Sequence, residues 1–536
     1  MLSSSSLRRR VVSRGFVRYL NNESLNREND VRLPGYDRSS ERNRILHVGV
    51  GNFFRSHLAR NVDRANEVFC DDEKMWNVHG VGIRDVEEER SMFERLEAQD
   101  GLYGLLGLPS GDVRVVGSLT KVSHIPSGGP AFQRVMADAI DYRTKIMSLT
   151  VTEKGYCQDA SGNLDTSIED VRHDIMLIKR AMNQSDFETL RRDPCRTALG
   201  LIASCLSLRD RFGEGKVPVT LLSCDNLPHN GNVLRRLVTQ ISDEINYDSL
   251  TQYVHDDTRV SFPNSMVDRI TPATTEDTVE TFAQYVDESK ELRCKWPVIA
   301  EDFTQWVLED KFVAGHPSFD QFEDIHFVEN VAPYEDMKLR LLNGSHTAMA
   351  YISRLAGLTN VDEAMLDSDI ERFVSSYMDD ATCSVPMVPG IDLEEYKQSL
   401  KSRFSNKAIS DLLERLCQDG SKKMIGFVLP VLQYKFNLDV QDKNSDTLRI
   451  EDVVASWVCY LAERDITQVD DPMAESLCRE ARLAVANEAG VREFIRNTLG
   501  GPHEGPNHER FVHGVSNSIG ILRNKNGGVR ELLRRV

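Results

Sequence analysis

The chain lacks the features that would tie it to a structural metal, a membrane or a nucleic acid. Its ten cysteines are scattered without a Cys-x-x-Cys pair, which suits reduced thiols of an intracellular protein and gives no zinc signature. No apolar run approaches the ~20 residues that span a bilayer. The net charge of −18 argues against a nucleic-acid or anionic-membrane surface. We therefore expect no structural zinc site and no nucleic-acid or membrane partner.

The first 22 residues differ in composition from the rest of the chain. They contain five arginines and five serines, and the first acidic residue is Glu23. Such a start resembles a mitochondrial or plastid transit peptide, but a basic tail of a cytosolic protein has the same composition. The composition is compatible with the cytoplasm or the mitochondrial matrix, and we treat residues 1–43 as a basic segment and linker outside the fold.

The next part of the chain alternates apolar strands with helical patterns. This alternation predicts an α/β fold with a doubly wound parallel sheet, a Rossmann-type domain, over residues 44–330. The expected strands are 44–51, 76–83, 113–116, 146–152, 217–223 and 297–300. From residue 331 to 536 long amphipathic stretches predict a mainly helical domain, with helices over 361–378, 393–404, 409–417 and 450–463.

The first strand ends in a glycine turn, Gly49-Val50-Gly51-Asn52-Phe53. Two glycines after a strand let the backbone approach a pyrophosphate at the next helix N-terminus. The third glycine of the usual fingerprint is missing, because Phe54 takes its place. A structural strand-to-helix turn is the alternative to a dinucleotide site.

Polar clusters follow the later strands as well, at the sheet edge where ligands of α/β proteins bind. Asp85 after the second strand is the candidate for an adenosine ribose contact and favours NAD, although Arg84 beside it suits the 2′-phosphate of NADP. Glu153 follows the strand 146–152. Asn226 and Asn230 follow the strand 217–223; an asparagine amide stabilises a developing alkoxide, but Asn230-Gly231 is also a common turn.

The stretch from Tyr334 to His346 predicts a helix that carries polar groups through apolar surroundings. At ~100° per residue, Glu335, Lys338, Asn343 and His346 fall within an arc of roughly 140°. Burial disfavours the charged form of a lysine and makes it a better base. The alternative is a snorkelling lysine beside a core histidine.

Seven segments in the same order resemble the polyol-specific long-chain dehydrogenases, from about residue 45 to 425. They are Gly-x-Gly-x-Phe at 49–53, Thr-Glu-Lys-Gly-Tyr at 152–156, Ser-Cys-Asp-Asn with His-Asn-Gly at 223–231, the Phe-Pro-Asn-Ser segment at 262–272, the Glu-Asp-Phe-Thr segment at 301–310, the helix at 334–346, and the segments at 403–406 and 419–423. The pattern is weak after about residue 430.

The resemblance implies NAD-linked interconversion of a polyol and a ketose, with mannitol and fructose as the type pair, in the cleft between a Rossmann-type and a helical domain. It also implies a metal-independent site and a monomer. Among the implied roles, Lys338 is the general base, and Asn226 with Asn343 holds the reacting oxygen. His346 orients the substrate and Glu335 passes the proton to solvent.

Further residues are candidates for binding. Arg415 and Lys423 fit the spacing of substrate-binding residues, with Arg403 and Lys422 as alternatives, and Asn230 and Asp268 are further substrate candidates. Gly49, Gly51, Asn52, Phe53, Asp85 and Glu153 are the cofactor candidates. Three other functions stay open, namely a hexuronate reductase for fructuronate or tagaturonate, an arabinitol dehydrogenase, and a catalytically silent NAD-binding protein.

Overall fold

The structure is a computed structural model. It describes residues 32–39, 42–68, 74–213, 217–286, 294, 296–409, 411–438, 448–499, 506–524 and 526–535. The basic segment 1–22 lies outside the described residues. The chain divides into two compact units, Met1–Val331 and Ala332–Val536. In the described ranges, no helix is both long and apolar enough to cross a bilayer.

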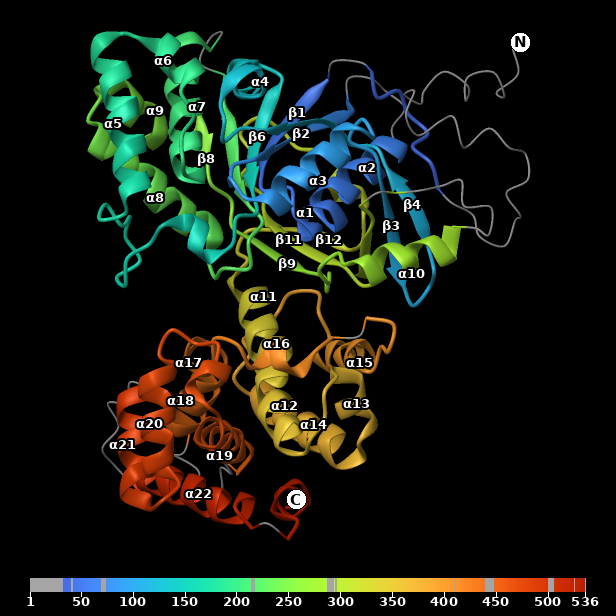
Figure 1. The fold of residues 1–536 in the computed structure, drawn as a ribbon, viewed down its shortest axis with the longest axis vertical. Helices are drawn as coiled ribbons and strands as arrows, with labels where there is room; N and C mark the ends of the chain where they lie inside the picture. The colour runs from blue at the N-terminus through green and yellow to red at the C-terminus, as the bar shows by residue number, and fades with distance from the viewer. Residues whose placement is uncertain are drawn as a thin grey trace. The chain divides into compact units, whose positions relative to one another are not determined.

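The first unit is built on a six-stranded parallel sheet (Figure 1). Its strands follow the order β5-β2-β1-β6-β7-β8, and every neighbouring pair is parallel. The bounds are β1 (Asn43–Val48), β2 (Trp76–Gly82), β5 (Leu119–His124), β6 (Thr144–Leu149), β7 (Val219–Ser223) and β8 (Val260–Ser261). The strand order reverses between β1 and β6, which is the position where doubly wound sheets bind ligands. The predicted Rossmann-type fold is confirmed.

Helices cover the sheet and supply its hydrophobic core. The cluster joins strand residues such as Leu46 and Met147 to Phe132, Ile178 and Leu206 of the helices. Each large aliphatic side chain buried here contributes about 1.5–3 kcal/mol of hydrophobic free energy. The helices are α1 (Asn52–Ser56), α2 (Leu58–Val68), α3 (Glu87–Glu97), α4 (Gly129–Ile140), η3 (Glu153–Tyr156), α5 (Glu169–Gln184), α6 (Phe187–Arg192), α7 (Ala198–Phe212), α8 (Asn230–Ile245), α9 (Asp248–His255), α10 (Glu276–Val286) and η4 (Phe319–Gln321).

Two smaller sheets lie beside the central one. One has the order β10-β3-β4 and the other β12-β11-β9. Their strands are β3 (Tyr103–Leu108), β4 (Val113–Val116), β9 (Ser265–Asp268), β10 (Val298–Glu301), β11 (Gln305–Glu309) and β12 (Ile325–Val328). The predicted strands 113–116 and 297–300 therefore exist, but they belong to a small sheet with an antiparallel β3–β4 pair and not to the central parallel sheet.

Part of the predicted linker is packed against the first unit. Arg32 pairs with Arg114 as an isolated β-bridge, next to β4. The Tyr36 hydroxyl donates to buried Asp63 at 2.6 Å, and Arg38 donates to the Gly117 carbonyl at 2.7 Å. The polar composition of this segment predicts a linker. In the structure, however, these long-range contacts hold it against the first unit.

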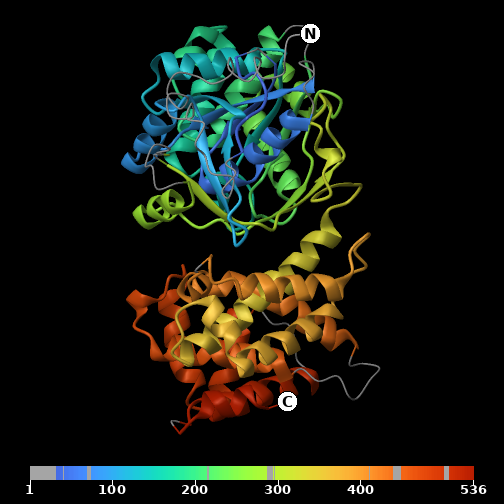
Figure 2. The same cartoon turned by 90° about the vertical axis from the view of Figure 1, so that its right-hand side faces the viewer.

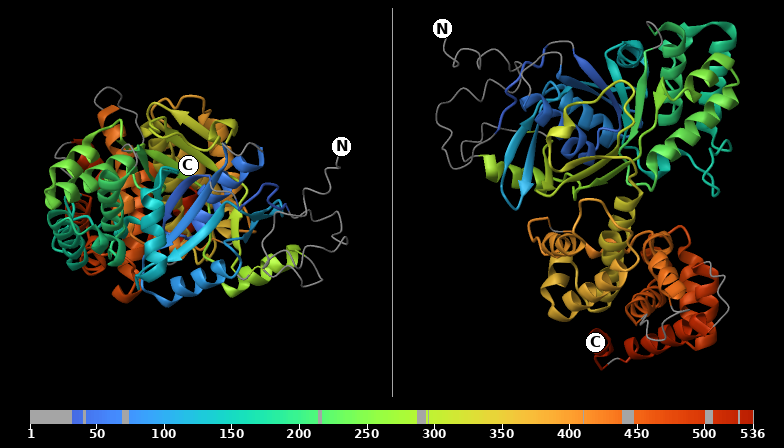
Figure 3. Two further views of the ribbon diagram at one scale, coloured as in Figure 1. Left: turned by 90° about the horizontal axis from the view of Figure 1, so that it is seen from above. Right: turned by 180° about the vertical axis from the view of Figure 1, so that it is seen from behind.

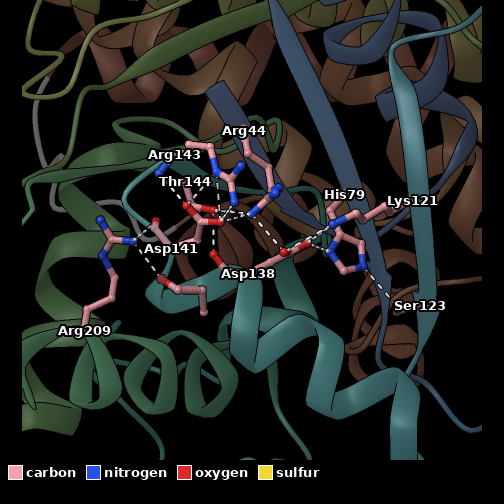
Figure 4. A network of polar contacts seen from close by, with 10 residues as sticks. Arg44, His79, Lys121, Ser123, Asp138, Asp141, Arg143, Thr144 and Arg209 are labelled. Atoms are coloured by element: carbon pink, nitrogen blue, oxygen red, sulfur yellow. Dashed lines mark hydrogen bonds and ion pairs between the residues drawn. The ribbon is translucent and has the colours of Figure 1, made fainter. Parts of the chain in front are cut away.

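A buried polar network joins the central strands to α4 (Figure 4). Asp138 of α4 pairs with Arg44 of β1 at 2.9 Å and with His79 of β2 at 2.8 Å. Lys121 of β5 lies 3.2 Å from the same carboxylate. Burial alone would raise the pKa of Asp138, but the hydrogen bond from His79 and the charges of Arg44 and Lys121 outweigh it and lower that pKa. The Asp138 carboxylate thus binds side chains from three strands, and their charges and hydrogen bonds offset the cost of burying it.

The named elements of the second unit are all helical (Figures 2 and 3). Helix α12 is buried from Gly344 to Ser353 and packs against α14, α16 and α19. The helices are α11 (Ala332–Met337), η5 (Lys338–Asn343), α12 (Gly344–Leu355), α13 (Val361–Leu366), α14 (Ser368–Thr382), α15 (Leu393–Phe404), α16 (Leu413–Cys417), α17 (Gly420–Lys423), η6 (Met424–Val428), α18 (Leu429–Leu438), α19 (Leu448–Glu463), η7 (Ile466–Gln468), α20 (Ala474–Ala484), α21 (Glu488–Thr498), α22 (Pro506–Leu522) and α23 (Gly528–Leu533).

The predicted single helix 361–378 is wrong, because Asp367 divides it. The backbone of Asp367 is extended, and its carboxylate accepts hydrogen bonds from the N–H groups of Asp369 and Ile370. An aspartate in this position is a typical N-cap, so it starts α14 and ends α13. The predicted helix 409–417 is shorter in the structure, where α16 begins at Leu413.

Candidate active site

The turn after β1 lies at the switch point of the central sheet. Gly49 has a φ of +96°, and a Cβ there would lie 2.1 Å from the Thr150 carbonyl oxygen after β6. A side chain at this position is excluded by both the backbone conformation and the neighbouring strand. Gly51, at the start of α1, has an ordinary φ of −75°, and a Cβ there would meet nothing within 4 Å. The turn therefore requires a glycine at Gly49, whereas the space beside Gly51 is not filled by other atoms of the chain.

Neighbouring side chains brace this turn from within the first unit. The Asn52 amide donates to the Pro272 carbonyl at 2.8 Å and accepts from Arg55 at 2.5 Å. Phe53 stacks on His57 with ring centroids 4.9 Å apart. These contacts give Asn52 and Phe53 a structural part in holding the turn, besides their predicted part in cofactor binding.

The loops after β6 and β7 are locked together by one carboxylate. Buried Asp225 accepts hydrogen bonds from the Val151 and Thr152 N–H groups at 3.0 and 2.8 Å and from the Tyr156 hydroxyl at 2.9 Å. Burial raises the pKa of Asp225, although these three donors act against the rise. The predicted cofactor residue Glu153 begins η3 in the loop that Asp225 holds, and it is exposed.

The two candidate asparagines after β7 have different environments. Asn226 is exposed, whereas Asn230 is fully buried at the start of α8. The Asn230 amide donates to the Asp225 and Ser265 carbonyls at 3.0 and 2.8 Å, and its oxygen accepts from the Ser265 N–H at 2.9 Å. Both ends of the Asn230 amide are thus engaged by the backbone, which favours the structural alternative for Asn230 and leaves Asn226 as the candidate donor.

The remaining two candidates of the first unit differ in exposure. Asp85 lies between β2 and α3, is exposed, and pairs with Arg90 at 2.7 Å. Its neighbour Arg84 is paired with Glu89, also at 2.7 Å. Asp268, at the end of β9, is buried at 4% exposure beside Arg269, which donates to the Ser56 and Glu301 carbonyls. Asp85 is thus a surface carboxylate paired with Arg90, while Asp268 belongs to the interior.

The helix that carries the catalytic candidates of the second unit is not a regular α-helix. Residues Lys338–Asn343 form the π-helix η5, and the Gly344 N–H donates to the Leu339 carbonyl five residues earlier. The predicted continuous α-helix is wrong for these six residues. In an α-helix Lys338 and Asn343 would lie about 140° apart. The i→i+5 bonding of a π-helix puts them one turn apart instead, on one side of the helix.

Three of the four candidates on this segment are buried. Lys338 and Glu335 are each 6% exposed and His346 is 9% exposed, while Asn343 is partly exposed. The His346 ring lies 4.2 Å from that of Phe404, and its Nε2 atom has no hydrogen-bond partner within the described residues. Burial lowers the pKa of His346 to about 3, so the imidazole is neutral at physiological pH.

The structure brings His346 together with the candidate cations of the second unit. The charges that act on His346 include those of Asp411, Arg415, Arg403 and Lys423. Arg415 of α16 is held by Asp411 through two contacts of 2.7 and 2.5 Å. Lys423, at the end of α17, donates to the Leu416 carbonyl at 2.9 Å. Burial, with the nearby charge of Arg415, lowers the pKa of Lys423.

A second π-helix supports the first. The segment η6 (Met424–Val428) begins directly after Lys423 and packs against both η5 and α12. π-helices are rare and occur frequently at functional sites. Each of the two here begins at or next to a candidate lysine. In the described part of the chain, no group of three or more histidine, cysteine or acidic side chains is placed to hold a metal ion.

Family models match both units of the chain. A model described as the mannitol dehydrogenase Rossmann domain matches residues 43–321, and one described as the mannitol dehydrogenase C-terminal domain matches residues 330–500. The chain belongs to the mannitol dehydrogenase family. The predicted class of NAD-dependent polyol dehydrogenase is confirmed with it.

Relatives in the mannitol dehydrogenase family match nearly the whole chain. A mannitol dehydrogenase of Saccharomyces cerevisiae is 32% identical over 95% of this chain and 96% of its own. A mannitol 2-dehydrogenase of Pyrenophora tritici-repentis is 34% identical over 90% of this chain and 81% of its own. Among solved structures, Pseudomonas fluorescens mannitol 2-dehydrogenase, in a ternary complex with NAD and D-mannitol, matches with 34% identity and a TM-score of 0.73, covering 94% of this chain and 96% of that one. A substrate-free D-sorbitol dehydrogenase matches with 30% identity and a TM-score of 0.77, covering 94% and 98%.

Sequence reasoning missed two carboxylates of this mannitol dehydrogenase family member. Asp225 stands within the quoted Ser-Cys-Asp-Asn segment, but its role in joining two loops depends on contacts that the sequence does not contain. Asp411 stands four residues before Arg415, and this spacing of opposite charges on a helical segment is a recognisable signal for a pair.

Proposed function

We propose that this protein interconverts D-mannitol and D-fructose by NAD-linked hydride transfer, with Lys338 as the general base and without a metal ion. The observation that carries the proposal is the π-helix η5, which puts Lys338 and Asn343 one turn apart and close in sequence to neutral His346. The ternary complex of the Pseudomonas relative with NAD and D-mannitol supports the choice of cofactor and substrate.

The switch-point turn of the first unit fits a dinucleotide. Gly49 gives the backbone its tight turn, and the space at Gly51 leaves the chain open to a pyrophosphate. We assign Gly49, Gly51, Asn52 and Phe53 to the cofactor, with exposed Asp85 for the ribose hydroxyls and Glu153 at the neighbouring loop. When bound, NAD accepts the hydride from the alcohol carbon.

The chain's own residues handle the proton and the developing negative charge. The neutral amine of Lys338, a buried side chain, accepts the hydroxyl proton. Asn226 and Asn343 donate hydrogen bonds to the oxygen as it gains negative character, and losing one such donor costs about 10²–10³ in turnover. Glu335, three residues before the base, passes the proton on to solvent.

Substrate hydroxyls are held by the polar groups around α12. Neutral His346 both donates and accepts hydrogen bonds, which suits a sugar hydroxyl. Arg415 and Lys423 of the same cluster donate to further hydroxyls. The pairing of Arg415 with Asp411 leaves guanidinium N–H groups for hydroxyls, because a fork to a carboxylate uses two of its five donors.

The decisive experiment measures NADH oxidation with fructose, fructuronate and tagaturonate. Wild type is compared with Lys338→Ala and with a control, Lys401→Ala. The control removes a lysine of α15 that pairs with Glu371 of α14 and has no proposed part in catalysis. We expect fructose-dependent turnover that falls at least about 10²-fold in Lys338→Ala and stays in the control. Turnover with the uronates alone would replace the substrate, and NADH binding without turnover would favour the silent binding protein.

A further inference from the structure

Asp411 holds Arg415 with both of its carboxylate oxygens. Arg415 Nε lies 2.7 Å from one oxygen and Nη2 lies 2.5 Å from the other, which is a bidentate pair. The Asp411 side chain is 12% exposed and that of Arg415 is 56% exposed. The carboxylate is therefore the buried partner, and the guanidinium reaches outward from it.

The charge of Asp411 acts on His346, Arg415 and Lys423. It is a carboxylate beside His346, where the cations Arg415, Arg403 and Lys423 act with the opposite sign, and its charge also acts on Lys423. Asp419 acts on Lys423 as well. The cationic groups near His346 are thus partly neutralised by acidic groups within the same segment, residues 411–423.

We propose that Asp411 determines specificity by adapting this cluster to uncharged polyols and ketoses and rejecting sugars that carry a carboxylate. With Nε and Nη2 of Arg415 taken and its charge already compensated by Asp411, a substrate carboxylate gains less from this arginine than it would from an unpaired one. A second negative charge near Asp411 would also be repelled. Neutral hydroxyls meet neither obstacle. The inference rests on the proposed function and names the residue that separates its substrate from that of a hexuronate reductase.

The substrate pair for the test differs in one group. Fructuronate has the ketone of fructose and carries a carboxylate at the far end of the carbon chain. Wild type, Asp411→Asn and the control Glu414→Gln are assayed with both substrates at low and high salt. Glu414 lies on α16 beside Arg415 and pairs with Arg354 and Arg464, so the control removes one negative charge three residues after Asp411.

We expect the ratio of kcat/KM for fructuronate to that for fructose to rise at least about tenfold in Asp411→Asn, with a smaller rise at high salt. The control should leave the ratio unchanged. Equal losses on both substrates in Asp411→Asn would show a merely structural role and overturn the inference. Failure of wild type to reduce fructose would instead contradict the proposed function, and the inference would fall with it.

A second variant keeps the test decisive if Asp411→Asn does not fold. Arg415→Gln leaves the Asp411 carboxylate without its guanidinium partner, so repulsion of an anionic substrate should grow. We expect the fructuronate to fructose ratio to fall below that of wild type. A ratio that rises or stays unchanged would overturn the inference.

Discussion

Gly49 lies against Thr150 so closely that a Cβ on the glycine would be 2.1 Å from the threonine carbonyl oxygen. The two residues follow β1 and β6, the strands on either side of the switch point. The Thr150 hydroxyl also donates to the Gly49 carbonyl at 2.7 Å. The absence of a side chain at Gly49 thus sets how near the two strand ends come at the predicted cofactor turn.

Gly49→Ala should destabilise the first unit. The positive φ and the clash with Thr150 together should cost more than about 2 kcal/mol, measured as a lower midpoint of urea denaturation. Gly51→Ala is the matched control, because its φ is ordinary and its Cβ meets no atom of the chain. We expect Gly51→Ala to keep the midpoint and to weaken NADH binding; unchanged NADH affinity would contradict its assignment to the cofactor.

Asn226→Ala and Asn230→Ala should separate catalysis from stability. Asn230 is buried and bonded to four backbone groups, so its loss should lower the free energy of unfolding by about 2–4 kcal/mol. Exposed Asn226 should affect stability little, while its loss lowers kcat about 10²–10³-fold. Thermal denaturation and fructose turnover are measured on both variants. A stable Asn226→Ala with full turnover would remove Asn226 from the mechanism.

Deleting Arg340 should convert η5 toward α-helical bonding, because a π-turn holds one more residue than an α-turn. Lys338 and Asn343 would then be four residues apart, about 40° around an α-helix, so they keep their common side and we expect fructose turnover to stay within about tenfold of wild type. Far-UV circular dichroism should show that the helices remain. Arg340→Ala is the control, since it removes only the pair with Asp336; a large loss of turnover in the deletion with full turnover in Arg340→Ala would contradict this expectation and show that the wider π-turn itself is needed.

Asp138→Ala should lower the free energy of unfolding by about 3–5 kcal/mol, because it leaves Arg44, His79 and Lys121 near one another without their carboxylate. The exposed pair Arg192–Asp193 provides the comparison, and Asp193→Ala should change stability by at most about 1 kcal/mol. Chemical denaturation measures both. Similar effects of the two substitutions would contradict the importance of the network in Figure 4.

Asp452 of α19 should make stability depend on pH. Burial raises the pKa of Asp452 to about 6, despite the hydrogen bond from Ser518 and the charge of Arg449. The folded protein then holds a proton that the unfolded chain releases near pH 4, so stability falls as pH rises from about 4 to about 6, by at most about 3 kcal/mol. Asp452→Asn should lack this part of the slope in urea denaturation across pH 4–8. Parallel pH profiles of the two proteins would contradict the raised pKa.

The sequence by itself determined the fold class, the glycine turn and the identity of the catalytic candidates. Apolar runs that end in polar clusters predict parallel strands with chemistry at their carboxyl ends, and β1, β2, β6 and β7 match them. These signals are local, because the period of apolar residues and the position of a glycine are written within a few residues.

Only the tertiary structure decided the π-helix, the sheet to which each strand belongs, and the part each polar residue plays. The residues of η5 are ordinary helix formers, and contacts with η6 and α14 accompany its wider turn. Asn226 and Asn230 look alike in the sequence, yet the Asn230 amide is buried and bonded to Ser265, whereas Asn226 is exposed. The hydrogen bonds between Asn230 and Ser265 join residues 35 positions apart, and the pairing of β1 with β6 joins residues still more distant in the sequence. Such contacts form only where the folded chain brings distant groups together, so a local sequence pattern does not predict them.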